Sequence, residues 1–236
     1  MSTQEFSYAF DTLLNSYALK AQFGDQTSHA TISLDEYEKS VFLTKAQEEI
    51  IVNLYNGRNA YGEAFETTEE MRRYLETLVQ TKVYSIEEKS EGTGVSEDSI
   101  FFVLPEDLAF ITMEQIQYDD ESLGCYNEKT ASVYPVTQDE YNKIKNNPFR
   151  GPTKYKAIRL DSGKNKVELI SKYKIKKYML RYLAKPTPII LVDLPEDVSI
   201  NGKHSRTDCA LNSVLHNIIL DRAVQLAAIS KGINIK

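Results

Sequence analysis

The chain has few of the residues from which catalytic and metal sites are most often built. Its 236 residues include two cysteines, three histidines and no tryptophan. Cys125 and Cys209 lie far apart, and neither has another cysteine or a histidine at metal-ligand spacing. Neither a disulfide framework nor a zinc site is therefore indicated, and we expect two ordinary buried or half-buried thiols.

Long apolar runs are also missing. No stretch approaches the roughly twenty apolar residues that a membrane span needs, and the polar start at residues 1–5 does not have the pattern of a secretory leader. The hydrophobic content of 42% is enough for a proper core, which argues against a disordered chain. We expect a folded protein that is made and used in a cytosol, with no membrane partner.

No motif for catalysis, cofactor binding or metal binding is found. His204 stands in a polar turn, and we place His216 at the exposed flank of the last helix. The glycines of residues 91–94 lack the lysine and the spacing of a phosphate loop, and the acidic run 119–121 is too short for a calcium loop. We predict no enzymatic activity; an enzyme with an unrecognised site is the third alternative, and it would need converging polar groups.

Helix signals dominate residues 1–90. Three Ser or Thr residues precede apolar stripes and have Glu or Gln at capping-box spacing: Ser2 with Glu5, Thr44 with Gln47, and Thr67 with Glu70. Gly24 and Gly57 stand where the first of these helices and the one from Thr44 would end. A further short helix is suggested at Ser33. These signals predict a helical N-terminal region.

Strand signals follow a polar loop at residues 91–98, part of the segment 87–98 where we place the main break in the chain. Strands are predicted at 100–104, 108–118, 132–136 and 189–192, with a hairpin of 154–160 and 167–170 around the polar turn 161–165. A short helix is predicted from Thr137. The strand-like alternation of apolar and polar residues shifts by one position at Lys176-Lys177, and a β-bulge there would account for the shift. Residues 99–206 are thus predicted to be mostly antiparallel sheet.

The last segment, 207–236, is predicted to be a helix from about Asn212 that packs back on the body. The fold class is therefore α+β: N-terminal helices, a central, mostly antiparallel sheet and a C-terminal helix, expected to form one structural unit.

Charge is distributed very unevenly along the chain. Residues 143–185 hold 14 Lys/Arg against Asp161 and Glu168, a net of +12, while the rest of the chain has a net of −18. Such polarity suits head-to-tail association between copies. We predict an inter-subunit basic face formed by Lys172, Lys174, Lys176, Lys177 and Arg181, which would meet the acidic helices of the next subunit.

The same segment permits a second interpretation. Its interleaved tyrosines are compatible with strands that stack bases between phosphate contacts: Tyr155, Tyr173, Tyr178 and Tyr182. The alternative function is therefore a DNA-contacting virion or replication protein that uses the basic strands within 143–185. The isoelectric point near 5.3 opposes non-specific attraction to phosphates.

Both ends of the chain resemble one known family. Residues 35–48 (DEYEKSVFLTKAQE) and 55–57 (YNG), together with 185–194 (KPTPIILVDL), 200–202 (ING), 215–216 (LH) and 221–227 (DRAVQLA), are similar to virion structural proteins of crAss-like tailed bacteriophages. The middle of the chain is less distinctive.

The resemblance implies a head-to-tail connector, or tail adaptor, with no catalytic residues to carry over. Such proteins form homo-oligomeric rings, twelve-fold by this resemblance, that are stacked below the portal and collar or line the DNA channel. The expected partners are copies of the chain, the portal, and other connector and tail ring proteins. Genome DNA would pass through without sequence-specific binding. The expected location is the virion, after assembly in the cytoplasm of the host bacterium.

Overall fold

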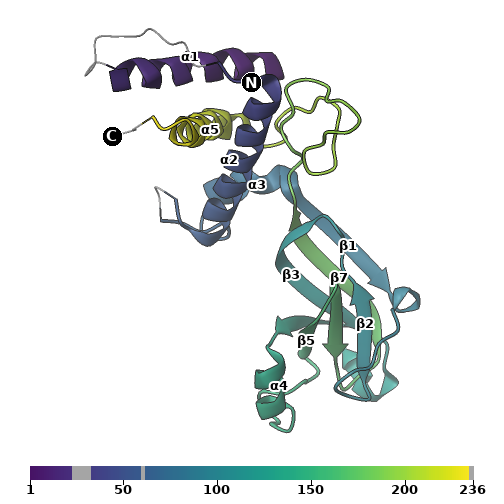
Figure 1. Cartoon of the computed structure of the whole chain (residues 1–236). Coiled ribbons are helices and arrows are strands. Elements are labelled where there is room, and N and C mark those ends of the chain that lie inside the picture. Colours follow the sequence, from purple (N-terminus) through teal and green to yellow (C-terminus); the bar gives the residue numbers. More distant parts are fainter. Residues whose placement is uncertain (23–32, 60–61, 234–236) are drawn as a thin grey trace. The chain divides into compact units, whose positions relative to one another are not determined.

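The computed structural model describes residues 1–22, 33–59 and 62–233 (Figure 1). The chain divides into two compact units: unit 1 comprises Met1–Leu78 and Pro186–Lys236, and unit 2 comprises Val79–Lys185. The divisions thus fall at 78/79 and 185/186 rather than in the loop at 87–98. Unit 1 is helical and unit 2 is built on a sheet, which confirms the predicted α+β class.

Unit 1 is formed by helices from both ends of the chain. They are α1 (Thr3–Gln22), α2 (Glu36–Asn56), α3 (Glu69–Leu75) and α5 (His216–Ser230), with the one-turn 3₁₀ helices η1 (Glu76–Leu78) and η4 (Ser213–Leu215). Apolar stripes on α1, α2 and α5 supply much of its buried core, including Phe6, Phe10, Leu43 and Ile219. Ser2 N donates to the Glu5 carboxylate at 2.7 Å, and Glu5 N donates to the Ser2 hydroxyl at 3.3 Å. These two bonds confirm this capping box.

Helix α2 begins earlier than the sequence pattern predicts. Asp35 is its N-cap and forms a capping box with Glu38. This N-cap lies nine residues before the predicted one at Thr44. Its end at Gly57 is confirmed, because this glycine adopts a φ of +72°. The N-cap of α3 is Thr68, one position after the predicted Thr67. The predicted stop at Gly24 lies outside the described residues.

Thr44 is instead part of a row of polar side chains that binds the extended segment 187–191. The Ser40 hydroxyl accepts from Leu191 N at 3.0 Å, the Thr44 hydroxyl accepts from Ile189 N at 3.1 Å, and Gln47 Nε2 donates to Thr187 O at 2.8 Å. These positions lie on one face of α2, three to four residues apart. They supply the hydrogen-bond partners that a neighbouring strand would otherwise provide.

The prediction of a strand at 189–192 is therefore wrong. The apolar run is buried from Ile189 to Leu191, but its only bridge in the described structure joins Ile190 to Thr207. A short apolar run does not reveal whether its buried backbone pairs with a strand or with helix side chains. Residues 186–212, much of which fell within the predicted β region, form no regular strand.

Two further predictions for unit 1 need correction or qualification. His216 is buried rather than exposed: Nε2 lies 3.1 Å from Leu211 O and Nδ1 lies 2.6 Å from the Met1 nitrogen. Burial lowers the pKa of this imidazole. Cys209 is half-buried as expected, with its thiol 3.4 Å from Gln47 Oε1. The same expectation is wrong for Cys125 of unit 2, which is exposed.

We expect Thr44→Val to lower the free energy of unfolding by about 1–3 kcal/mol, because it leaves the buried Ile189 backbone without its hydroxyl partner. The matched control is Thr12→Val on the exposed side of α1, where the hydroxyl bonds only to Tyr8 O of its own helix; its effect should stay within about 0.5 kcal/mol. Urea denaturation followed by circular dichroism measures both. Equal effects would show that the α2 row contributes no special stability.

Unit 2 contains one seven-stranded sheet in the order β1-β7-β3-β4-β5-β6-β2. The strands are β1 (Val79–Ser85), β2 (Ser99–Val103), β3 (Leu108–Tyr118), β4 (Thr130–Pro135), β5 (Lys156–Gly163), β6 (Lys166–Ile170) and β7 (Ile175–Ala184). All neighbours are antiparallel except β4 and β5, which helix α4 (Gln138–Ile144) connects. Two 3₁₀ helices, η2 (Ile86–Glu88) and η3 (Glu121–Tyr126), complete the unit.

The sheet curls until its two edge strands meet. The Tyr84 hydroxyl of β1 donates to Val103 O of β2 at 2.8 Å, and Ser90 N donates to Phe101 O at 2.8 Å. The rings of Tyr84 and Phe102 are in contact, with centroids 5.4 Å apart. Burial raises the pKa of Tyr84 to about 12, so the hydroxyl remains a donor at neutral pH. The inner face of the curled sheet encloses the core of the unit.

Several local predictions for unit 2 are confirmed. The hairpin of β5 and β6 turns through Lys164 and Asn165, both at positive φ. Thr137 caps α4 through Glu140 N at 3.2 Å. The predicted bulge is also present: Lys177 pairs with Gln117 and Ile175 pairs with Tyr118, which leaves Lys176 as the extra residue.

Strand β1 corrects the prediction that residues 1–90 are helical. The helical apolar stripe stops at Leu78, and residues 79–85 pair with β7 in unbroken register. Val79, Thr81, Val83 and Tyr84 are residues that favour strands, and the available neighbour β7 decides between helix and strand here. The helical spacing of apolar residues before Leu78 gave no sign that the chain changes from helix to strand there.

An ion pair lies inside the curled sheet. Glu114 of β3 and Arg159 of β5 are both buried, and Arg159 Nη1 lies 2.6 Å from Glu114 Oε2. The Tyr178 hydroxyl of β7 donates to the other Glu114 oxygen. Burial raises the pKa of Tyr178 far above its usual range, so this hydroxyl stays protonated. The carboxylate thus connects three strands of the sheet.

We expect Glu114→Gln to lower the free energy of unfolding by about 3–5 kcal/mol. The buried Arg159 would lose its buried partner and keep only the exposed Asp161 carboxylate, 3.3 Å from its Nε. The control is Asp139→Asn, which removes the exposed pair with Lys143 at 2.9 Å and should cost less than about 1 kcal/mol. Chemical denaturation checks both. A loss as small as that of the control would mean that Arg159 reaches water without difficulty.

Candidate inter-subunit surface

The five predicted basic residues lie on β7 and the loop before it. Lys172 and Lys174 precede the strand, and Lys176, Lys177 and Arg181 belong to it. Strand β7 lies between β1 and β3, so its side chains point to one face of the sheet or the other rather than along an edge. All of them except the half-buried Lys176 are exposed.

Only part of this set shares a face of the sheet. Lys177 and Arg181 lie four positions apart with Met179 between them, opposite Gln117 and Met113 of β3. The bulge removes Lys176 from this alternation. Its ammonium is 2.9 Å from Glu128 Oε1, and this hydrogen bond raises the pKa of Lys176 and lowers the pKa of Glu128. Lys176 therefore has an ion-pair partner within its own unit.

The loop before β7 is fixed through its backbone. Asp119 N donates to Lys174 O at 2.9 Å, and Lys174 N donates to Asp120 Oδ2 at 3.1 Å. Hydrogen bonds from Ser122 and from this backbone N–H lower the pKa of Asp120. The loop is thereby held against η3. In the part of the chain that the structure describes, the side chains of Lys172, Lys174, Lys177 and Arg181 form no hydrogen bond or ion pair.

Much of the remaining basic segment is neutralised or bonded inside unit 2. Arg159 is buried against Glu114; other contacts are Lys143 with Asp139, Arg150 with Glu140, Lys166 with Glu91 O, and Lys185 with Glu106 O. Unit 2 as a whole contains 17 Lys/Arg and 16 Asp/Glu, a net of +1, which leaves −7 for unit 1. The strong asymmetry along the sequence thus largely cancels within one folded unit.

The tyrosines of the basic segment do not form a stacking surface along β7. Tyr178 and Tyr182 are buried on the inner face of the sheet, and Tyr173 is half-buried with its ring against Tyr118. Tyr155 alone of the four is exposed. Base stacking along these strands is therefore not available to Tyr178 or Tyr182.

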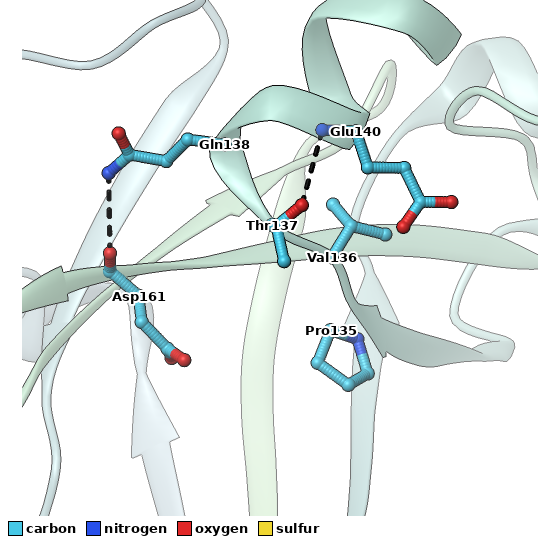
Figure 2. A pocket seen from close by; sticks show the side chains of 6 residues that line it. All are labelled: Pro135, Val136, Thr137, Gln138, Glu140 and Asp161. Atoms are coloured by element: carbon cyan, nitrogen blue, oxygen red, sulfur yellow. Dashed lines mark hydrogen bonds between the residues drawn. The ribbon is translucent and has the colours of Figure 1, made fainter.

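A shallow pocket beside α4 is lined by Pro135, Val136, Thr137, Gln138, Glu140 and Asp161. Figure 2 shows the Gln138 amide donating to Asp161 O at 3.5 Å and the Thr137 hydroxyl accepting from Glu140 N. These bonds cap the helix and join it to β5. Among the described residues no group of three His, Cys, Asp or Glu is placed to hold a metal ion. No described helix combines the length and apolarity needed to cross a bilayer.

The chain matches one protein family over its full length. The family model described as phage tail ring protein 3/4 covers residues 1–236. A curated relative from Bacteroides phage crAss001, "Ring protein 3", is 51% identical over 233 residues, which cover 98% of this chain and 96% of the relative. A second from the same phage, "Ring protein 4/5", is 32% identical over 236 residues, with coverages of 96% and 92%.

These matches define the class of the protein as a structural component of a phage virion. The chain belongs to the phage tail ring protein 3/4 family of crAss-like phages. The family expected from residues at both ends of the sequence is thereby confirmed. Membership implies a place in an oligomeric ring.

We expect Lys177→Glu with Arg181→Glu to change the free energy of unfolding by less than about 1 kcal/mol in total, because both side chains are exposed and lack partners within the described structure. Lys176→Glu should be more destabilising than Lys177→Glu alone, since it places a second carboxylate beside Glu128. Circular dichroism during urea unfolding compares the variants. A loss of several kcal/mol in the double variant would reveal an internal role for these cations.

Proposed function

We propose that the protein is a non-enzymatic ring component of the head-to-tail junction. Copies of the chain close into a twelve-fold homo-oligomer between the portal and the tail, and the ring collars or lines the DNA channel. Two points support this: the chain belongs to a tail ring family, and two proteins named for rings in one phage are similar to it along its whole length.

The contact between neighbours is heterologous, so it needs two different complementary faces on each copy. The observation that carries it is a set of four cations, Lys172, Lys174, Lys177 and Arg181, whose side chains form no hydrogen bond or ion pair with the described residues. They lie on a unit of net charge +1. The acidic unit 1, at −7, is the complementary part of the next subunit. Charge pairs of this kind set orientation and register, and apolar contacts supply most of the affinity.

The ring's further partners are the portal and other connector or tail ring proteins. Since two proteins of one phage are 51% and 32% identical to this chain, rings of related fold are the expected neighbours. Genome DNA passes through the ring without sequence-specific contacts. The ring is assembled in the host cytoplasm and remains in the virion.

We expect Lys177→Glu with Arg181→Glu to reduce the ring-sized fraction at least tenfold at moderate salt, because acidic groups of the next subunit would then face like charges. Native mass spectrometry and light scattering over a range of concentration and salt measure this. The matched control is Lys89→Glu with Lys164→Glu, an equal change of charge at exposed positions outside β7 and its two neighbouring strands, which should assemble normally.

Rings that form unchanged in the β7 variant would contradict the role of the basic face while leaving the ring itself intact. A native chain that stays monomeric at all concentrations, alone and with its portal and ring neighbours, yet retains duplex DNA with a steep salt dependence would contradict the ring proposal. That result would favour a DNA-contacting protein.

A further inference from the structure

Four aromatic side chains and three cations of unit 2 form two groups that adjoin through residues 154–156. Tyr126 and Tyr155 lie with Lys154, and Tyr134 lies with Lys156, whose ammonium donates to Arg150 O beside Phe149. We call them the aromatic cluster: Tyr126, Tyr134, Phe149, Tyr155, Arg150, Lys154 and Lys156. Phe149 is 91% exposed, Tyr155 56% and Tyr134 51%. Single exposed apolar residues are ordinary, but several aromatic residues with arginine are typical of the energetic centre of a protein interface.

Phe149 is presented by a loop that is held in one conformation. Asn147 Oδ1 accepts from Phe149 N at 2.9 Å and from Arg150 N at 3.2 Å, and Gly151 N donates to Asn147 O at 2.8 Å. Lys156 Nζ donates to Arg150 O at 2.7 Å. A Cβ on Gly151 would lie 2.8 Å from Asn147 O, so the tight turn needs glycine. The backbone that carries the exposed ring is thus preorganised, which reduces the entropy lost on binding.

The cluster adjoins the basic face of β7. The rings of Tyr126 and Tyr155 meet edge to face at 4.9 Å, and Lys154 Nζ lies 5.4 and 5.0 Å from their centroids. Tyr126 belongs to η3. Beside this segment, Asp120 accepts from the backbone N–H of Lys174, and Glu128 accepts from the Lys176 ammonium. An aromatic centre bordered by cations has the arrangement of an interface core and its rim.

Protein fits this surface better than nucleic acid does. Lys154 stands over Tyr155, and Lys156 stands over Tyr134 at 5.3 Å. The Tyr126 and Tyr155 rings are nearly perpendicular, at 88°. Successive bases need open and roughly parallel ring faces, which these tyrosines do not offer. A partner with aliphatic side chains and carboxylates would match both the rings and the ammonium groups of Lys154 and Lys156, whereas Arg150 is already paired with Glu140.

The exposed face of α5 offers that chemistry. Ile218 and Ile229 are 49% and 62% exposed, and Val214 lies just before the helix at 57%. Asp221 is also exposed, and its spacing from Ile218 places it on this side of the helix. The described residues of unit 1 leave these aliphatic side chains exposed, and the net charge of −7 on unit 1 is complementary to the cations of the aromatic cluster.

We infer that the aromatic cluster binds the exposed face of α5 in a second copy of the chain, with Phe149 as its anchor. This inference rests on the proposed ring and names the apolar centre of its subunit contact. The basic face of β7 would form the adjoining charged part of the same interface.

Cys125 provides a test because it is exposed and immediately precedes Tyr126. In a Cys209→Ser chain it is the single thiol. Its labelling rate with a maleimide should fall at least tenfold when monomers close into rings. Benzophenone attached to Cys125, in rings mixed from ¹⁴N and ¹⁵N chains, should then cross-link between copies to residues 214–229.

Phe149→Ala should reduce ring formation at least tenfold, whereas Tyr8→Ala, which truncates an aromatic residue 74% exposed on α1, should not. Equal labelling of Cys125 in monomer and ring, or cross-links between copies that avoid 214–229, would overturn the inference while the ring stands. Slower labelling of Cys125 that appears only when another ring protein is added would also overturn the inference. If the native chain forms no ring under any condition, the proposed function itself fails.

Discussion

The fold of unit 1 depends on how one buried stretch of backbone finds its hydrogen-bond partners. After unit 2 the chain returns to the helices as the extended segment 187–191, whose one strand-like pairing among the described residues is the isolated bridge from Ile190 to Thr207. Ser40, Thr44 and Gln47 of α2 provide the partners instead. Because buried N–H and C=O groups are costly when unpaired, this row fixes the position of the returning chain along α2. Helix α5 can then join α1 and α2 in one core.

Unit 2 holds its backbone differently, through pairs within one curled sheet whose edge strands come into contact. Tyr84 and Ser90 join the edge strands, and Glu114 connects β3, β5 and β7 from within. The strand pairs lie within the sheet itself. Its basic and acidic halves are brought together in the process, so few cations remain for other molecules. Charge along a sequence is therefore a poor measure of charge on a surface.

The features predicted from the sequence with success are those set by near neighbours. The Ser2 and Thr137 caps, the β5–β6 hairpin and the bulge at Lys176 each depend on a few consecutive residues. The failures involve partners that are distant in sequence. β1 is a strand because β7 lies beside it, and the Thr44 hydroxyl accepts from Ile189 N, 145 residues away. The pairing of Lys176 with Glu128 was missed for the same reason. Phe149 gave no signal, because a loop residue has no periodic pattern to mark its exposure.

The loop that presents Phe149 also bears on how related rings can differ from one another. Its turn is held by Asn147 and Gly151, while the ring of Phe149 packs in neither core of the described structure. The residue at this position can therefore change without disturbing the fold that carries it. Partner choice and foldability are thus under separate control, and a duplicated gene could acquire a new neighbour by altering a single loop tip.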